Sequence, residues 1–127
     1  MSPRSTEFLD AAHRRLAAAS AVLEEDASTA LSAAYYAMLY AARAALSERD
    51  VYTKTHRGLW HELRRIFVET GELDAGLVAS VQKIQPEREQ ADYDGWAAPA
   101  EDARHAVELA GTFITAIEKL CASGKKS

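Results

Sequence analysis

The stretch Arg88-Glu89-Gln90-Ala91-Asp92-Tyr93 combines a guanidinium, carboxylates and a phenol within one short segment. Before it, Leu77, Val81 and Ile84 recur at helical spacing, and the same period continues to Arg88. The pattern therefore predicts that Arg88 lies on the buried face of a helix. A buried charge is costly unless it is paired or has a function, so this position is the first candidate for chemistry.

Two interpretations of Arg88 follow from its spacing to Asp92. The two residues are four apart, so they can form an ion pair that closes one end of a helical bundle. Alternatively, Arg88 presents its guanidinium to a phosphate, with Tyr93 nearby as a hydrogen-bond donor or stacking ring. Pro86 precedes this stretch and is expected to kink or restart the helix, because proline cannot donate to the carbonyl of Gln82.

A second cluster of basic residues, Lys54, His56 and Arg57, falls at the predicted start of another helix, with Thr55 as its N-cap. Backbone N–H groups at a helix N-terminus favour an anion, so these side chains can hold a phosphate together with that helix end. The alternative is a solvated basic loop without a ligand.

The sequence contains no motif typical of a metal site, a nucleotide-binding loop or a hydrolase nucleophile. The histidines are His13, His56, His61 and His105, and their spacing gives no metal-ligand pair on one helix. Nucleotide-binding glycine loops and the nucleophile elbow of hydrolases are also absent from the sequence. We therefore expect neither a metal nor a cofactor.

Helical periodicity runs along the whole chain and predicts an all-α fold. Five helical segments are expected at about residues 6–24, 27–48, 56–70, 74–94 and 99–122. The second is the most continuously apolar and should be central. Short connections favour antiparallel neighbours, which gives an up-and-down four- to five-helix bundle with the third helix short and oblique. Tyr35 and Tyr36 point about 100° apart on a helix and are not expected to face the same neighbour.

Size and charge set further bounds. With 127 residues, the chain is expected to form a single domain, residues 1–127, with a frayed tail at 123–127. The net charge of −4 excludes the broad basic surface of an ordinary duplex-DNA binder. The single cysteine, Cys121, is expected to be buried and reduced. The sequence shows no membrane span of about 18 apolar residues and no signal-like segment, so a cytoplasmic location is expected.

Four segments together resemble the HEPN domain superfamily, in particular its small stand-alone bacterial and archaeal branch. They are Ala34-Tyr35-Tyr36-Ala37-Met38-Leu39-Tyr40-Ala41-Ala42-Arg43-Ala44-Ala45-Leu46, Lys54-Thr55-His56-Arg57-Gly58-Leu59, Phe67-Val68-Glu69-Thr70-Gly71 and the stretch from Arg88 to Tyr93. The resemblance implies a helical bundle that forms a homodimer around its central helices. It also implies a toxin–antitoxin role beside a minimal nucleotidyltransferase, and metal-independent endoribonuclease activity in active members.

The resemblance also implies a hallmark, an arginine followed after four to six residues by a histidine. Arg88 is kept, but Asp92 and Tyr93 stand where the histidine is expected. Arg49 and His56 match the spacing formally, but they fall in the connection after the second helix. His56 is instead a candidate to fold toward Arg88 and supply the missing imidazole.

These observations lead to two functional hypotheses. In the first, the chain is a toxin–antitoxin component that acts on RNA or binds nucleotides, with metal-independent endoribonuclease activity and a degenerate arginine–histidine motif as its most specific form. The candidate catalytic residues are Arg88, Asp92, Tyr93 and His56, and the candidate phosphate- or nucleotide-binding residues are Lys54, Arg57, Tyr35 and Tyr36. In the second, the same cleft serves a non-catalytic module that binds a nucleotide or a partner nucleotidyltransferase.

Overall fold

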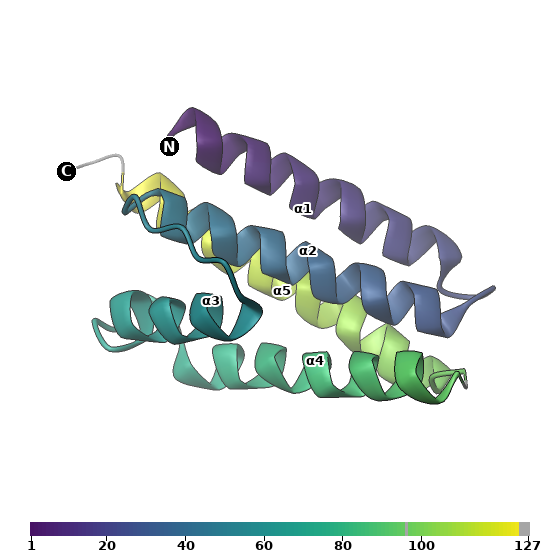
Figure 1. Ribbon diagram of the computed structural model, residues 1–127. Coiled ribbons are helices and arrows are strands. Elements are labelled where there is room, and N and C mark those ends of the chain that lie inside the picture. The colour runs from purple at the N-terminus through teal and green to yellow at the C-terminus, as the bar shows by residue number, and fades with distance from the viewer. Residues whose placement is uncertain (96, 125–127) are drawn as a thin grey trace.

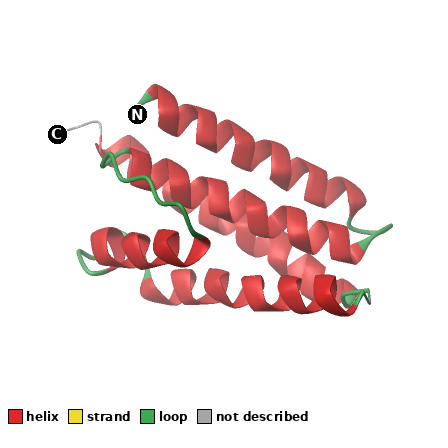
Figure 2. Ribbon diagram, in the orientation of Figure 1, coloured by secondary structure: helices red, strands yellow, loops and turns green. Residues whose placement is uncertain are grey.

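The computed structural model describes residues 1–95 and 97–124, and within them all side chains except those of 87, 90–94 and 124. The described chain is all-helical, as Figure 2 shows, and forms the predicted up-and-down bundle. Its elements are α1 (Pro3–Val22), α2 (Ala27–Ser47), α3 (His56–Leu63), the π-helical turn η1 (Arg64–Val68), α4 (Ala75–Asp94) and α5 (Ala100–Gly124).

Local capping chemistry explains most of the helix boundaries. Asp26, Thr55 and Asp74 each accept a hydrogen bond from a backbone N–H of the helix that follows, and for Thr55 this confirms the predicted N-cap. Gly71 has a φ of 82° and ends the third helical segment in the left-handed conformation. The first helix begins earlier than expected, because Ser2 caps it by accepting from Ser5 N.

The predicted restart of α4 at Pro86 is wrong. The helix continues through Pro86 to Asp94. Pro86 is exposed, so its ring does not disturb the buried face of the helix. This continuity places Arg88 in register with the buried residues Val81 and Ile84.

Helix α2 is the centre of the bundle, as its apolar composition predicts. It packs most extensively against α1 and α5, and it also contacts α3 and α4. Figure 1 shows α1 and α2 running antiparallel, with α5 behind α2 and α3 and α4 along its lower side. Buried alanines of α2, among them Ala34, Ala41 and Ala45, allow this close packing. Leu46 is buried as well, and a side chain of this kind contributes about 2 kcal/mol when fully buried.

The connection between α2 and α3 determines where α3 begins. In Figure 1 it leaves the C-terminal end of α2, turns back and runs along that helix before α3 starts. Val51 packs against the core, and Arg43 Nη1 lies 3.5 Å from the Thr53 carbonyl oxygen. The start of α3 is thereby brought to the middle of α2 rather than to its end.

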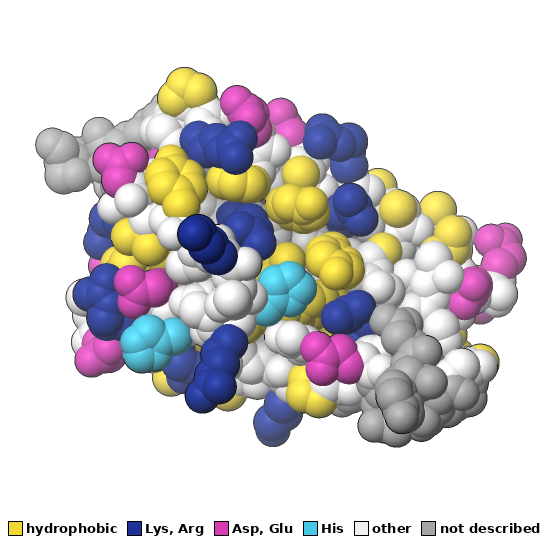
Figure 3. Space-filling model, in the orientation of Figure 1, with side chains coloured by type: hydrophobic (Ala, Val, Ile, Leu, Met, Phe, Trp, Pro, Cys, Tyr) yellow, Lys and Arg dark blue, Asp and Glu magenta, His cyan; other side chains and the backbone are white. Residues whose placement is uncertain are grey.

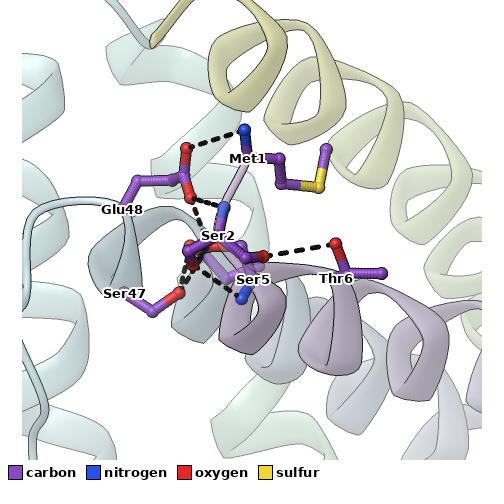
Figure 4. A network of polar contacts seen from close by, with 7 residues as sticks. Met1, Ser2, Ser5, Thr6, Ser47 and Glu48 are labelled. Carbon is purple, nitrogen blue, oxygen red and sulfur yellow. Dashed lines mark hydrogen bonds and ion pairs between the residues drawn. The ribbon is translucent and has the colours of Figure 1, made fainter. Parts of the chain in front are cut away.

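A network of polar contacts joins the start of α1 to the end of α2 (Figure 4). Glu48 Oε2 accepts from Ser2 N at 2.8 Å and from Ser5 Oγ at 2.6 Å, and Ser5 Oγ lies 2.6 Å from Ser47 Oγ. The Met1 ammonium lies 4.0 Å from Glu48 Oε1. We refer to Met1, Ser2, Ser5, Ser47 and Glu48 as the Glu48 cluster.

Cys121 is buried in the core near this cluster, as predicted. Burial raises the pKa of its thiol to about 11, and the Glu48 carboxylate adds to that effect. The thiol is therefore protonated at neutral pH and behaves as a small apolar side chain.

Candidate functional site

Arg88 lies on the buried side of α4, as its spacing predicts. Its side chain is only 15% exposed. The Cζ atom lies 5.3 Å from the ring centroid of Tyr35 and 5.4 Å from that of Tyr36. A guanidinium within about 6 Å of an aromatic ring is attracted by the negative face of that ring. The bundle therefore holds this buried cation against two aromatic rings of α2.

The two tyrosines correct one expectation from the sequence. Their Cα–Cβ bonds diverge as expected for adjacent helical residues, but both rings reach Arg88. The ring centroids are 5.5 Å apart in an edge-on arrangement, so the rings converge beyond the backbone. We call Tyr35 and Tyr36 the tyrosine pair.

His56 contacts the same tyrosine pair from the first turn of α3. Its ring centroid lies 5.8 Å from that of Tyr35 and 6.1 Å from that of Tyr36. Its Nδ1 atom is 3.2 Å from Tyr35 Oη. The N-cap at Thr55 fixes the helix start from which the imidazole projects. The structure thus brings Arg88 and His56, far apart in the sequence, to one pair of rings.

Tyr35 is fully buried, and its hydroxyl is the centre of a hydrogen-bond network. Tyr35 Oη donates to Gln85 Oε1 at 2.9 Å and accepts from Trp60 Nε1 at 3.4 Å. Gln85 Nε2 in turn donates to Glu89 Oε1 at 2.8 Å. Burial raises the pKa of Tyr35 above its usual value, so the phenol keeps its proton at neutral pH.

Burial and nearby cations both act on the imidazole of His56. Burial, followed by the positive charges of Arg43 and Arg88, lowers the pKa of His56, and Glu89 opposes this shift. The imidazole is therefore mainly neutral at pH 7. Such an environment favours a ligand that brings negative charge, because an anion relieves the repulsion among the cations.

Sequence reasoning did not assign a role to Arg43, Gln85 or Trp60. Arg43 lies on the same face of α2 as Tyr36, two turns further along, and this spacing is a signal that could have identified it. Gln85 and Trp60 gave no comparable signal. Their part depends on how α3 and α4 pack against α2.

The remaining predicted residues lie in three different situations. Lys54 and Arg57 are exposed on either side of His56 at the start of α3. Arg49 Nη2 donates to Glu72 Oε1 at 2.8 Å, and its Cζ atom lies 4.8 Å from the Phe67 ring centroid. The Arg49 side chain is therefore engaged with Glu72 and Phe67 and not with His56. The side chains of Asp92 and Tyr93 lie outside the described residues, and the predicted Arg88–Asp92 clamp with them.

A groove of about 360 Å³ opens on the other side of Tyr36. Its lining residues are Arg15, Ser28, Thr29, Ser32, Ala33 and Tyr36. The Cζ atom of Arg15 lies 5.9 Å from the Tyr36 ring centroid and 5.6 Å from that of Tyr40. Tyr36 is therefore shared between Arg88 and a second cation at the edge of this groove.

Figure 3 shows the face of the molecule formed by α1, the α2–α3 connection, α3 and α4. Lysine and arginine side chains are spread over this face, and a histidine borders an apolar patch within it. A chain with a net charge of −4 thus has a face on which basic side chains are prominent.

Two further properties concern the described residues only. Among them, no three or more His, Cys, Asp and Glu side chains are grouped so that they can hold a metal ion. None of the helices in this part of the chain combines the length and the apolar composition of a membrane span.

The all-helical fold agrees with the family resemblance of the sequence. The profile of the HEPN domain family matches residues 5–120, and this chain belongs to that family. The chain is also similar to a protein of Methanocaldococcus jannaschii named "Putative toxin MJ0142". The two are 34% identical over 65 residues, which is 51% of this chain and 44% of the relative. The match thus spans less than half of the length of the relative.

Proposed function

We propose that this chain is the toxin component of a toxin–antitoxin pair and acts as a metal-independent endoribonuclease. The observation that supports this proposal most directly is the convergence of Arg88 and His56 on the tyrosine pair. A guanidinium and an imidazole thereby meet in a family whose hallmark is an arginine and a histidine. In this chain His56 takes the part of the histidine that is absent after Arg88.

The chemistry requires an acid–base pair and a cation. One group takes the proton of the ribose 2′-hydroxyl, whose oxygen then attacks the adjacent phosphorus and forms the 2′,3′-cyclic phosphate, while the bond to the 5′ oxygen breaks and that oxygen gains a proton from water. Neutral His56 suits the first step, because its lowered pKa keeps it unprotonated near pH 7. Arg88 suits the stabilisation of the negative charge that develops on the phosphoryl oxygens. Arg43 adds to the positive potential at the same place.

The proposal extends to partners. The name of the M. jannaschii relative supports a toxin role, and the family resemblance supports a homodimer and a minimal nucleotidyltransferase as antitoxin. Single-stranded RNA is the favoured substrate, because its unstacked bases can stack on a half-buried aromatic ring and an exposed guanidinium such as those of Tyr36 and Arg15 at the groove.

A second candidate function is a binding module without catalysis. It is favoured by Asp92 and Tyr93, which occupy the positions where the hallmark histidine is expected. In this case Arg88 and the tyrosine pair hold a nucleotide or RNA phosphate, or form part of the surface that meets the nucleotidyltransferase.

Cleavage of single-stranded RNA in the presence of EDTA tests the first proposal. We expect the unmodified protein to produce fragments with 2′,3′-cyclic phosphate ends, and Arg88→Ala and His56→Ala each to abolish them. Arg104→Ala and His105→Ala are matched controls, because both residues are exposed on α5. Full cleavage by His56→Ala contradicts the assignment of His56. RNA that is bound but left intact by the unmodified protein favours the second function.

A further inference from the structure

We infer that Tyr35 and Gln85 hold neutral His56 in the tautomer that carries its proton on Nδ1, which leaves the lone pair on Nε2. The two residues are thus positioning residues, which act on the histidine and not on the substrate. The use of this tautomer in RNA cleavage rests on the function proposed above. The tautomer itself is a property of the free protein and can be measured without RNA.

The first step concerns the orientation of the Gln85 amide. Glu89 is a carboxylate, which can only accept hydrogen bonds. The amide nitrogen of Gln85 must therefore be the atom that lies 2.8 Å from Glu89 Oε1. This leaves the amide oxygen of Gln85 facing Tyr35 Oη, at 2.9 Å.

The second step concerns the single proton of the Tyr35 hydroxyl. Gln85 Oε1 is an acceptor without a hydrogen of its own, so the hydroxyl proton of Tyr35 points to it. The indole Nε1 of Trp60 is a donor only, and it occupies another position on the same oxygen at 3.4 Å. Tyr35 Oη therefore has no proton left to give to His56.

The third step fixes the histidine. Because Tyr35 Oη can only accept on that side, the Nδ1 atom of His56 at 3.2 Å must be the donor. A neutral imidazole carries one proton, so its Nε2 atom is the acceptor. Protonation adds a hydrogen to Nε2 and leaves the bond to Tyr35 intact. The imidazole can take up and release a proton at Nε2 without any rearrangement of the network.

The arrangement gives the proposed reaction a defined proton-accepting atom. With the other tautomer, Nε2 would already carry a hydrogen and could not take the 2′-hydroxyl proton. The hydrogen-bond network begins at Glu89 on α4 and ends at His56 on α3. Through the buried phenol of Tyr35 on α2, it determines which nitrogen of the imidazole carries the proton. Each hydrogen bond has its direction assigned by a group that can only donate or only accept.

Nuclear magnetic resonance of the protein labelled with ¹⁵N in its histidines tests this inference. Above the pH of titration, long-range couplings to the ring carbon protons distinguish the protonated from the unprotonated nitrogen. We expect His56, assigned by the loss of its signals in His56→Ala, to show a protonated Nδ1. The exposed histidines His61 and His105 serve as references in the same spectrum, because an unrestrained imidazole favours the proton on Nε2. A His56 spectrum like theirs overturns the inference.

Two variants probe the network directly. Gln85→Leu removes the acceptor for the Tyr35 hydroxyl, which becomes free to donate to Nδ1, and we expect the His56 signals to shift toward the other tautomer. Tyr35→Phe removes the hydroxyl and should give the same direction of shift. Gln82→Leu is the control, because Gln82 lies one turn earlier on α4 and accepts from Arg64 Nε at 2.6 Å instead. An unchanged His56 spectrum in Gln85→Leu contradicts the inference.

The two proposals can fail separately. If the unmodified protein shows the Nδ1–H tautomer but cleaves no RNA, the ribonuclease function is wrong and the tautomer assignment stands. If cleavage depends on His56 while the imidazole carries its proton on Nε2, the function stands and the positioning role of Tyr35 and Gln85 is wrong.

Discussion

Two polar networks flank α2, and they differ in how their charges are balanced. In the Glu48 cluster, a single carboxylate is surrounded by donors, namely the Ser2 amide, the Ser5 hydroxyl and the Met1 ammonium. Around the tyrosine pair, by contrast, the cations Arg88 and Arg43 act on His56, and Glu89 opposes them. The first network surrounds one carboxylate with donors. The second holds two cations beside one carboxylate, because Arg88 Nη2 lies 3.9 Å from Glu89 Oε1 and Arg43 adds a further positive charge near His56.

This difference separates a structural role from a ligand-binding role. A buried charge whose partners are all supplied by the fold contributes to holding helices together. A group of cations that act on one another is unfavourable by itself and becomes favourable when an anion joins it. We therefore expect charge removal at the Glu48 cluster to reduce stability, and charge removal at Arg88 to reduce binding.

The largest expected effect is on RNA binding by Arg88→Met. Methionine retains much of the apolar volume beside the tyrosine pair but has no charge, so the free energy of unfolding should change little. Loss of a buried charged contact to a phosphate should weaken the binding of single-stranded RNA on the order of 100-fold. Fluorescence anisotropy at fixed salt measures the affinity, with Arg104→Met as control. Equal affinity of the two variants would contradict the assignment of Arg88.

Glu48→Leu should show the opposite behaviour. The Ser2 amide loses its acceptor in a partly buried environment, and the Ser5 hydroxyl is left with the Ala44 carbonyl and Ser47 as partners. We expect this change to destabilise the fold by about 2 kcal/mol. RNA affinity should remain within about twofold of the unmodified protein, because the cluster lies at the far end of α2. Chemical denaturation gives the stability. Glu62→Leu is the control, since Glu62 forms an exposed pair with Arg65 and its loss should change the stability little.

The two networks should also lose stability in different pH ranges. The pKa of His56 is lowered, so its contribution is fully present above the unfolded pKa of 6.5 and is lost as the pH falls through the folded pKa below it. Burial favours a higher pKa for Glu48, but the hydrogen bonds from Ser2 and Ser5 outweigh it and lower that pKa. The contribution of Glu48 is present above the unfolded pKa of 4.5 and is lost at lower pH.

Measured unfolding free energies can separate these ranges. The difference between the unmodified protein and His56→Gln should change between about pH 7 and 5, whereas the difference for Glu48→Gln should change only below about pH 4.5. A pH-independent difference for His56→Gln would show that the cations do not act on the imidazole as described.

The smallest expected effects concern the two helix caps. Ser2→Ala at the Glu48 cluster and Thr55→Ala beside His56 should each cost about 1 kcal/mol, because each removes an acceptor from a helix N-terminus. Only Thr55→Ala should also reduce RNA cleavage, because it loosens the turn that carries His56. Equal cleavage by the two variants would argue against a role for α3 in positioning the imidazole.

Much of the fold could be predicted because its causes are local. The helical period of Leu77, Val81 and Ile84 was sufficient to assign Arg88 to a buried face, and Thr55 marked a helix start by its capping side chain. Pro86 was misleading, because a proline removes one hydrogen bond from the helix, whereas the packing of Val81 and Ile84 holds the helix on the bundle. The spacing rule for Tyr35 and Tyr36 also failed, since it describes where side chains leave the backbone and not where their rings end.

The sequence by itself determined the all-helical bundle, the central position of α2 and the burial of Arg88, because these follow from helical periodicity and hydrophobic burial. Only the tertiary structure decided that His56 meets Arg88 across the tyrosine pair. That meeting depends on the connection between α2 and α3, which returns along α2 before the next helix begins. The roles of Arg43, Trp60 and Gln85 depend on the same packing, because hydrogen bonds and charge interactions act through distance in space rather than separation along the chain.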